Sequence, residues 1–157
     1  MLACVRADRS ALPLSLIFQA ANGNIRSTWV QHIKAGKHDV FTTSSLSGWT
    51  NNEIGLAWLE QVFDRKTKIK AQGRWRLLII NGHGSHLTQE FLAFCDENRI
   101  LLFVFPAHST HTLQPLDVVC FKPLSSSYTQ ALDIFMHTTQ GYLVIKKGDF
   151  FPIFWDA

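Results

Sequence analysis

The clearest pattern along the chain is a pair of apolar runs separated by an amphipathic segment. Trp75–Ile80 and Ile100–Phe105 are apolar almost throughout, and each is short enough for a strand. Between them, Thr88 begins a helix of roughly eleven residues. A helical connection favours parallel pairing of the two strands. Strands that are apolar on both faces are typical of a sheet covered on both sides.

A second pair of strands is predicted near the amino terminus. Residues 2–7 and 12–20 read as strands, and the turn-like ADRSA between them favours an antiparallel hairpin. The segment 27–48 is polar and loop-rich, with one short strand predicted near Val40–Thr42. Together with the runs above, these segments predict an α/β fold: a mixed sheet with helices on both faces.

The remaining segments are predicted to be two helices and a polar connection. Thr50 can cap a helix that starts near Asn51, with Glu53 at the third position as in a capping box. We expect this helix to end before the basic segment 64–74. An amphipathic stretch from about residue 118 to 135 predicts another helix.

Composition narrows the class of protein without fixing it. The chain has 157 residues, of which 46% are hydrophobic and 17% charged, as in a globular domain. The net charge of +3 permits a nucleic-acid partner but does not require one. Three scattered cysteines without a CxxC disfavour a disulfide framework, and no apolar run reaches the ~20 residues of a membrane span. We therefore expect a nuclear or cytosolic protein without a membrane partner.

Polar residues follow both central strands. Asn81 directly follows the first, and LQPLD after the second brings Asp117 to the start of a helix. Functional groups collect at the carboxyl ends of parallel strands. Four histidines lie near the same ends, as two His-x-x-His pairs. These histidines are His83, His86, His108 and His111. Three interpretations stay open for them: zinc binding, ordering of loops, and contact with a substrate phosphate.

The strongest basic cluster is the segment from Arg65 to Arg76. A solvated surface loop is one interpretation of these cations. The other is contact with the DNA backbone, in particular through Lys68 and Lys70.

The blocks GHGSH and HSTHTLQPLD, at this separation, carry a resemblance to a known family. The stretch RLLIINGHGSHLTQEFLAFCDENRILLFVFPAHSTHTLQPLDVVCFKPL resembles the pogo/Tigger-type DDE transposases, which are related to Tc1/mariner. GWTNNEIGLAWLEQVFD and ADRSALPLSLIF are similar to the same family. The resemblance covers nearly the whole chain and implies one partial DDE domain, residues 1–157, with an RNase H-like fold.

The resemblance also implies an active site of three carboxylates that hold two Mg²⁺ or Mn²⁺ ions. The family's second aspartate falls on Asn81 and its third on Asp117, with 35 residues between them. The first would end a first strand upstream of Ala3, which this chain lacks. Mg²⁺ prefers carboxylate oxygens. Asp117 would therefore be a metal ligand beside a neutral Asn81, and we expect no productive binding of the metal pair.

These expectations combine into a transposon-derived domain that binds DNA weakly, largely through backbone contacts, and does not cleave or join it. The four histidines, Lys68 and Lys70 are the expected contacts to nucleic acid, and the nucleus is the expected location. Two alternatives stay open, namely an active metal-dependent DDE endonuclease and a domesticated protein-interaction module.

Overall fold

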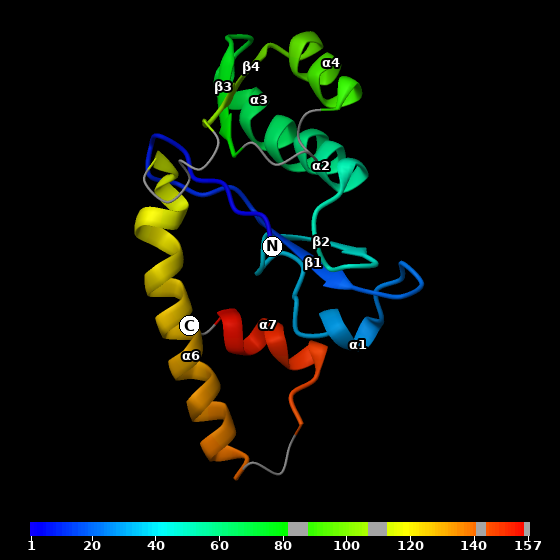
Figure 1. Cartoon of the computed structure of the whole chain (residues 1–157), viewed down its shortest axis with the longest axis vertical. Helices are drawn as coiled ribbons and strands as arrows, with labels where there is room; N and C mark the ends of the chain where they lie inside the picture. Colours follow the sequence, from blue (N-terminus) through cyan, green and yellow to red (C-terminus); the bar gives the residue numbers. More distant parts are fainter. Residues whose placement is uncertain (82–87, 107–112, 141–143, 156–157) are drawn as a thin grey trace.

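The computed structural model describes residues 1–81, 88–106, 113–140 and 144–155. Figure 1 shows the elements in chain order. They are β1 (Leu14–Gln19), α1 (Ser27–Val30), β2 (Val40–Ser45), α2 (Asn52–Trp58), the π-helical η1 (Leu59–Asp64), α3 (Arg65–Ala71), β3 (Arg76–Ile80), α4 (Gln89–Glu97), β4 (Ile100–Val104), the π-helical η3 (Leu116–Cys120), α6 (Phe121–Thr138) and α7 (Lys147–Trp155).

The four strands form two separate parallel sheets. β3 pairs with β4 in a register that runs from Arg76 opposite Ile100 to Ile80 opposite Val104. The predicted parallel pairing of these strands, with α4 between them, is therefore confirmed. β1 pairs with β2, from Leu14 opposite Val40. The α/β class is confirmed, but the described residues form two two-stranded sheets and not the single mixed sheet that we expected.

The amino-terminal hairpin is present only in part. Leu2 and Ser15 exchange two backbone hydrogen bonds of 2.8 and 2.9 Å, and Val5 is bridged to Ala11. The first predicted strand is thus reduced to two antiparallel bridges. The main partner of β1 is β2, because all six residues of β1 find a parallel partner there.

The β3–β4 sheet is covered on one face. Leu78 and Ile100, each 3% exposed, point into a core with Leu59, Phe63 and Phe91. Alternate strand residues point to opposite faces. The other face carries four apolar side chains that are 47–59% exposed: Leu77, Ile79, Leu101 and Phe103. Within the described ranges, the expectation of cover on both faces is therefore wrong for this sheet.

One helical segment runs without interruption through α2, η1 and α3. Its N-cap is Asn51, whose Oδ1 accepts a 2.9 Å hydrogen bond from the Ile54 N–H, and not Thr50 as predicted. The basic segment after residue 64 is helical, which corrects the expectation that the helix ends before it. Burial of Leu59, Val62 and Phe63 in the core explains why the helix continues through η1.

The cap predicted for α4 is confirmed. Oγ1 of Thr88 accepts a 3.2 Å hydrogen bond from the Phe91 N–H, which satisfies one of the unpaired donors of the first turn.

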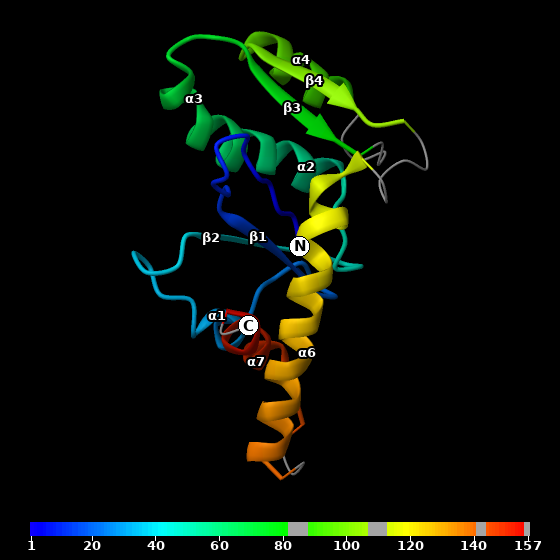
Figure 2. The same cartoon turned by 90° about the vertical axis from the view of Figure 1, so that its left-hand side faces the viewer.

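A second, smaller core lies below the first in Figure 1. Leu16, Phe18 and Phe151 are buried there, and Trp29 packs against them. α6, predicted near 118–135, follows η3, and in Figure 2 it runs from the carboxyl end of β3 past β1 to α7; none of its residues is fully buried. Within the ranges described, no helix combines the length and the apolar character that crossing a bilayer requires.

Candidate functional site

The first candidate edge is formed by the carboxyl ends of β3 and β4. Asn81 directly follows β3 and is half-buried. Asp117 lies in η3 and is exposed, and its backbone N–H donates a 3.1 Å hydrogen bond to the Gln114 carbonyl. Both views place the start of η3 beside the carboxyl end of β3 (Figures 1 and 2). The fold therefore brings the two predicted positions to the same side of the domain.

The four histidines of the sequence prediction, His83, His86, His108 and His111, lie outside the described residues. Their proposed contacts with nucleic acid stay predictions.

The described part of the carboxyl edge does not suit the metal pair that the resemblance implies. Asn81 offers a neutral amide oxygen and Asp117 one exposed carboxylate. Within the ranges that the structure covers, no three His, Cys, Asp or Glu side chains gather where they could hold an ion. Two divalent cations need more negative charge than one carboxylate supplies. No chemical step is therefore assigned to a metal at this edge.

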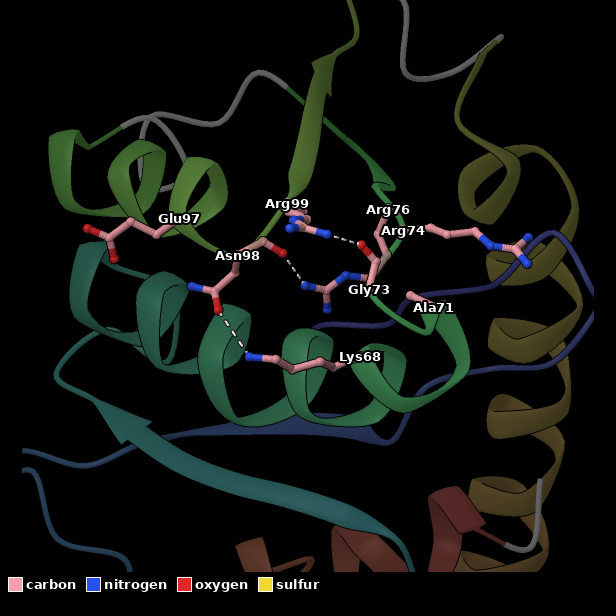
Figure 3. Close-up of a pocket in the computed structure, with 8 residues that line it drawn as sticks. All are labelled: Lys68, Ala71, Gly73, Arg74, Arg76, Glu97, Asn98 and Arg99. Atoms are coloured by element: carbon pink, nitrogen blue, oxygen red, sulfur yellow. Dashed lines mark hydrogen bonds between the residues drawn. The ribbon is translucent and has the colours of Figure 1, made fainter.

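The second candidate edge lies at the opposite, amino-terminal ends of the same strands. A cavity of about 210 Å³ opens there between the end of α3 and the turn from α4 to β4. Figure 3 shows the residues that line it: Lys68, Ala71, Gly73, Arg74, Arg76, Glu97, Asn98 and Arg99. Four of these side chains are cations and one is a carboxylate, so the cavity is strongly basic.

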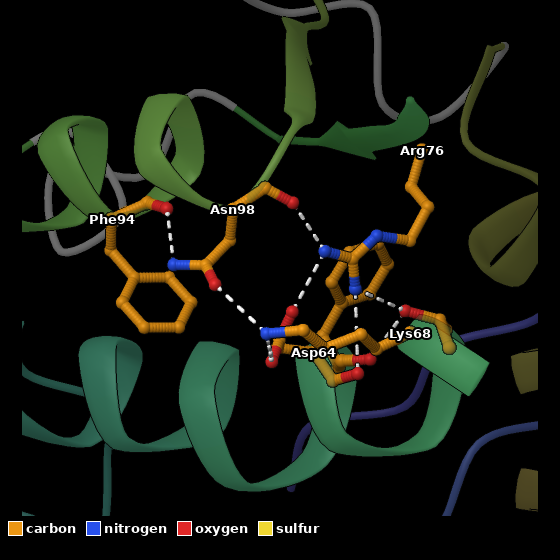
Figure 4. Close-up of polar contacts among 7 residues, drawn as sticks. Asp64, Lys68, Arg76, Phe94 and Asn98 are labelled. Atoms are coloured by element: carbon orange, nitrogen blue, oxygen red, sulfur yellow. Dashed lines mark hydrogen bonds and ion pairs between the residues drawn. The ribbon is translucent and has the colours of Figure 1, made fainter. Parts of the chain in front are cut away.

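Arg76 links the helical segment to the turn before β4 through an ion pair and hydrogen bonds. Its Nη2 lies 2.7 Å from Oδ1 of Asp64 and donates a 2.5 Å hydrogen bond to the Asn98 carbonyl. Oδ1 has no well-aligned hydrogen-bond donor within the described residues, so the contact with Asp64 is mainly an ion pair. Nη1 donates to Oγ1 of Thr67 at 3.0 Å. Figure 4 shows Arg76 joining the long helix to the turn before β4.

The two predicted lysines lie on the exposed surface of α3. Nζ of Lys68 is 3.6 Å from Asp64 and 3.2 Å from Oδ1 of Asn98, and its side chain is 63% exposed. Lys70 pairs with Asp8 in the amino-terminal hairpin. The hydrogen bond from Lys70, followed by those from Ser10, lowers the pKa of Asp8 well below its usual range.

Arg99 and Arg74 complete the basic edge. Arg99 has a left-handed backbone with φ 57°, and its Nη1 donates a 2.5 Å hydrogen bond to the Gly73 carbonyl. Arg74 is exposed, and its guanidinium has no hydrogen bond or ion pair to the rest of the described chain.

Sequence reasoning missed Arg99 as part of this site, although a signal was available. Parallel strands in register place their preceding residues side by side, so Arg99 had to lie near Arg74 and Arg76 once β3 was paired with β4.

Charge along the chain is uneven. The segment 64–76 contains six of the fifteen cations and one of the twelve carboxylates, so it carries +5. The remaining residues carry nine cations and eleven carboxylates, or −2. The positive charge of the molecule is therefore concentrated at the amino-terminal edge of β3.

The comparisons with known proteins show the family of the chain. Residues 1–142 match the family described as DDE superfamily endonuclease, and the chain belongs to that family. Within it, the relatives point to a pogo-type DDE domain. The human "Pogo transposable element with KRAB domain" is 34% identical over 80 residues, which is 51% of this chain and 13% of that protein.

Two further proteins are similar to the chain. The human "Pogo transposable element with ZNF domain" is 34% identical over 76 residues, 48% of this chain and 5% of that protein. The "MFS-type transporter clz9" of Cochliobolus lunatus is 43% identical over 108 residues, 69% of this chain and 11% of that protein. The chain thus spans a small part of the curated relatives it matches. No solved structure matches it.

Proposed function

We propose that this chain is a transposase-derived DDE domain that binds DNA through backbone phosphates and neither cleaves nor joins it. The observation that carries the proposal is Asn81, a neutral amide at the end of β3 where the resemblance places a carboxylate. Among the described residues at this edge, Asn81 is neutral and Asp117 carries one negative charge, whereas the resemblance implies a carboxylate at both positions.

A nicking assay on supercoiled plasmid with Mn²⁺ tests the absence of cleavage. We expect no metal-dependent nicking by the chain, because Asn81 presents a neutral amide oxygen where a divalent cation prefers a carboxylate. Metal-dependent nicking that Asp117→Ala abolishes would overturn the proposal. Asp133→Ala, which removes an exposed carboxylate from α6, is the matched control.

The DNA-binding half of the proposal is supported by the charge of +5 on segment 64–76 and by the exposure of Lys68 and Lys70. Contacts to phosphate release counterions, so the affinity should fall steeply with added salt and depend little on base sequence. A binding titration with DNA at several salt concentrations measures this. A DNA-binding role also places the expected site of action in the nucleus.

A further inference from the structure

The cations of the amino-terminal edge differ in role: some bind backbone carbonyls of the chain, and others are available to a ligand. Both α3 and α4 end at the cavity, and the carboxyl end of a helix favours cations. Arg76 and Arg99 serve this structural need, because each donates a hydrogen bond to a backbone carbonyl, that of Asn98 and Gly73 respectively.

The cavity keeps a net positive charge even though Arg76 and Arg99 are hydrogen-bonded to backbone carbonyls. The four lining cations face the Glu97 carboxylate in the cavity wall and the adjacent Asp64, which leaves a net charge of +2. Lys68 is largely exposed, and its contacts are a 3.6 Å ion pair with Asp64 and a 3.2 Å hydrogen bond to Oδ1 of Asn98. In Figure 3, Arg74 extends outward from the turn before β3, away from the other cations. Cavity size, excess charge and available donors all suit a phosphate group.

An exposed aromatic ring lies beside these cations in the sequence. Trp75 stands between Arg74 and Arg76, directly before β3, and is 60% exposed. A large exposed ring flanked by cations is typical of a surface on which an unpaired base stacks while its phosphates meet the cations. The bases of a duplex are stacked on each other and do not offer such a face.

We propose that this cavity binds backbone phosphates of an unpaired nucleic-acid strand, with Trp75 as the stacking surface for one of its bases. The inference rests on the proposed function, which includes DNA binding, and adds the location and the strand form of the contact. It places that contact at the amino ends of β3 and β4, away from Asn81 and Asp117 at their carboxyl ends.

Fluorescence anisotropy with a labelled single-stranded oligonucleotide of mixed sequence tests the site. We expect Lys68→Gln combined with Arg74→Gln to weaken binding about tenfold at low salt. The slope of log affinity against log salt should fall by about 1.4, since each phosphate contact to a single strand contributes ~0.7. The matched control is Lys34→Gln with Lys37→Gln, which removes the same charge from an exposed loop before β2 and should change the affinity less than about twofold.

The stacking surface has its own matched pair. Trp75→Ala should weaken single-strand binding about tenfold. Trp49→Ala removes a ring that is 76% exposed elsewhere and should have little effect. Unlabelled duplex of the same sequence should compete less well than unlabelled single strand. Circular dichroism of every variant checks that it is folded.

The outcomes separate the two proposals. If wild type binds DNA but the Lys68/Arg74 pair weakens binding no more than the Lys34/Lys37 pair, the site is wrong and DNA binding stands. Competition by duplex as strong as by single strand, or equal effects of Trp75→Ala and Trp49→Ala, overturns the unpaired-strand inference. If wild type binds neither form, the DNA-binding half of the proposed function fails with it.

Discussion

The two ends of the β3–β4 sheet carry opposite kinds of chemistry on the same pair of strands. At the carboxyl end, the described side chains are the amide of Asn81 and the single carboxylate of Asp117. At the amino end, four cations surround a cavity, and Arg76 is fixed by contacts to Asp64 and Asn98. The difference teaches that one end of a strand pair can carry few charged side chains while the other end keeps a connected network of ion pairs and hydrogen bonds.

The largest effect should come from removing the cation that holds the amino end together. Arg76→Met leaves the Asp64 carboxylate, whose side chain is 12% exposed, without its 2.7 Å partner. The carboxylate would then face only the largely exposed Lys68 at 3.6 Å, so the free energy of unfolding should fall by about 3 kcal/mol. Urea denaturation measures it.

The matched control removes both charges. Arg76→Met combined with Asp64→Leu should recover most of the loss, because no buried charge is left unpaired. A double variant as unstable as the single one would show that the hydrogen bonds of Arg76 to Asn98 and Thr67 matter more than the ion pair.

A second effect should separate the two faces of the same sheet. Leu78→Ala empties a position that is 3% exposed and should cost about 3 kcal/mol. Leu77, one residue earlier, is 57% exposed on the opposite face of the sheet. Leu77→Ala should therefore change the free energy of unfolding by less than about 0.5 kcal/mol. Equal losses would mean that the second face is covered in solution.

The smallest effect concerns the exposed link between the amino-terminal hairpin and α3. The pKa of Asp8 is lowered when the chain is folded, chiefly by Lys70. Its contribution to stability is therefore present above the unfolded pKa of about 3.9 and is lost as the pH falls below it. The midpoint of thermal unfolding should be slightly lower for Asp8→Asn than for wild type at neutral pH. The two midpoints should converge in strong acid, and a constant difference at all pH values would contradict the link.

The parts of the fold that sequence predicted correctly have local signals. β3, α4 and β4 follow from two short apolar runs, the capping residue Thr88 and a connection of helical length. The pairing of β1 with β2 has no such signal, since the strands are separated by a polar segment and neither alternates strongly. The continuation of the helix through Arg65–Ala71 was missed because polarity suggested a loop. Lysine, arginine and alanine are nevertheless good helix formers, and Asp64 anchors the segment to Arg76.

The residues of the candidate site also fall into those that the sequence predicted and those that only the fold reveals. The motif identified Asn81 and Asp117, and the fold brings them to the same side of the domain. Arg99 was overlooked because it is isolated in the sequence, and its role follows only from the register of two strands. The ion pair of Asp64 with Arg76 and the hydrogen bond of Asn98 with Lys68 are tertiary contacts that no spacing in the sequence encodes.

The π-helical winding of η1 allows this short segment to hold an extra residue. Six residues, Leu59–Asp64, are wound more widely than an α-helix, and α3 continues directly from them. A wide turn accommodates about one residue more than an α-helical path between the same two ends. Loss of one codon here would therefore restore α-helical winding, while the core side chains upstream and the lysines of α3 kept nearly the same directions. Evolution could thus change the length of this helix without redirecting the positive surface of the domain.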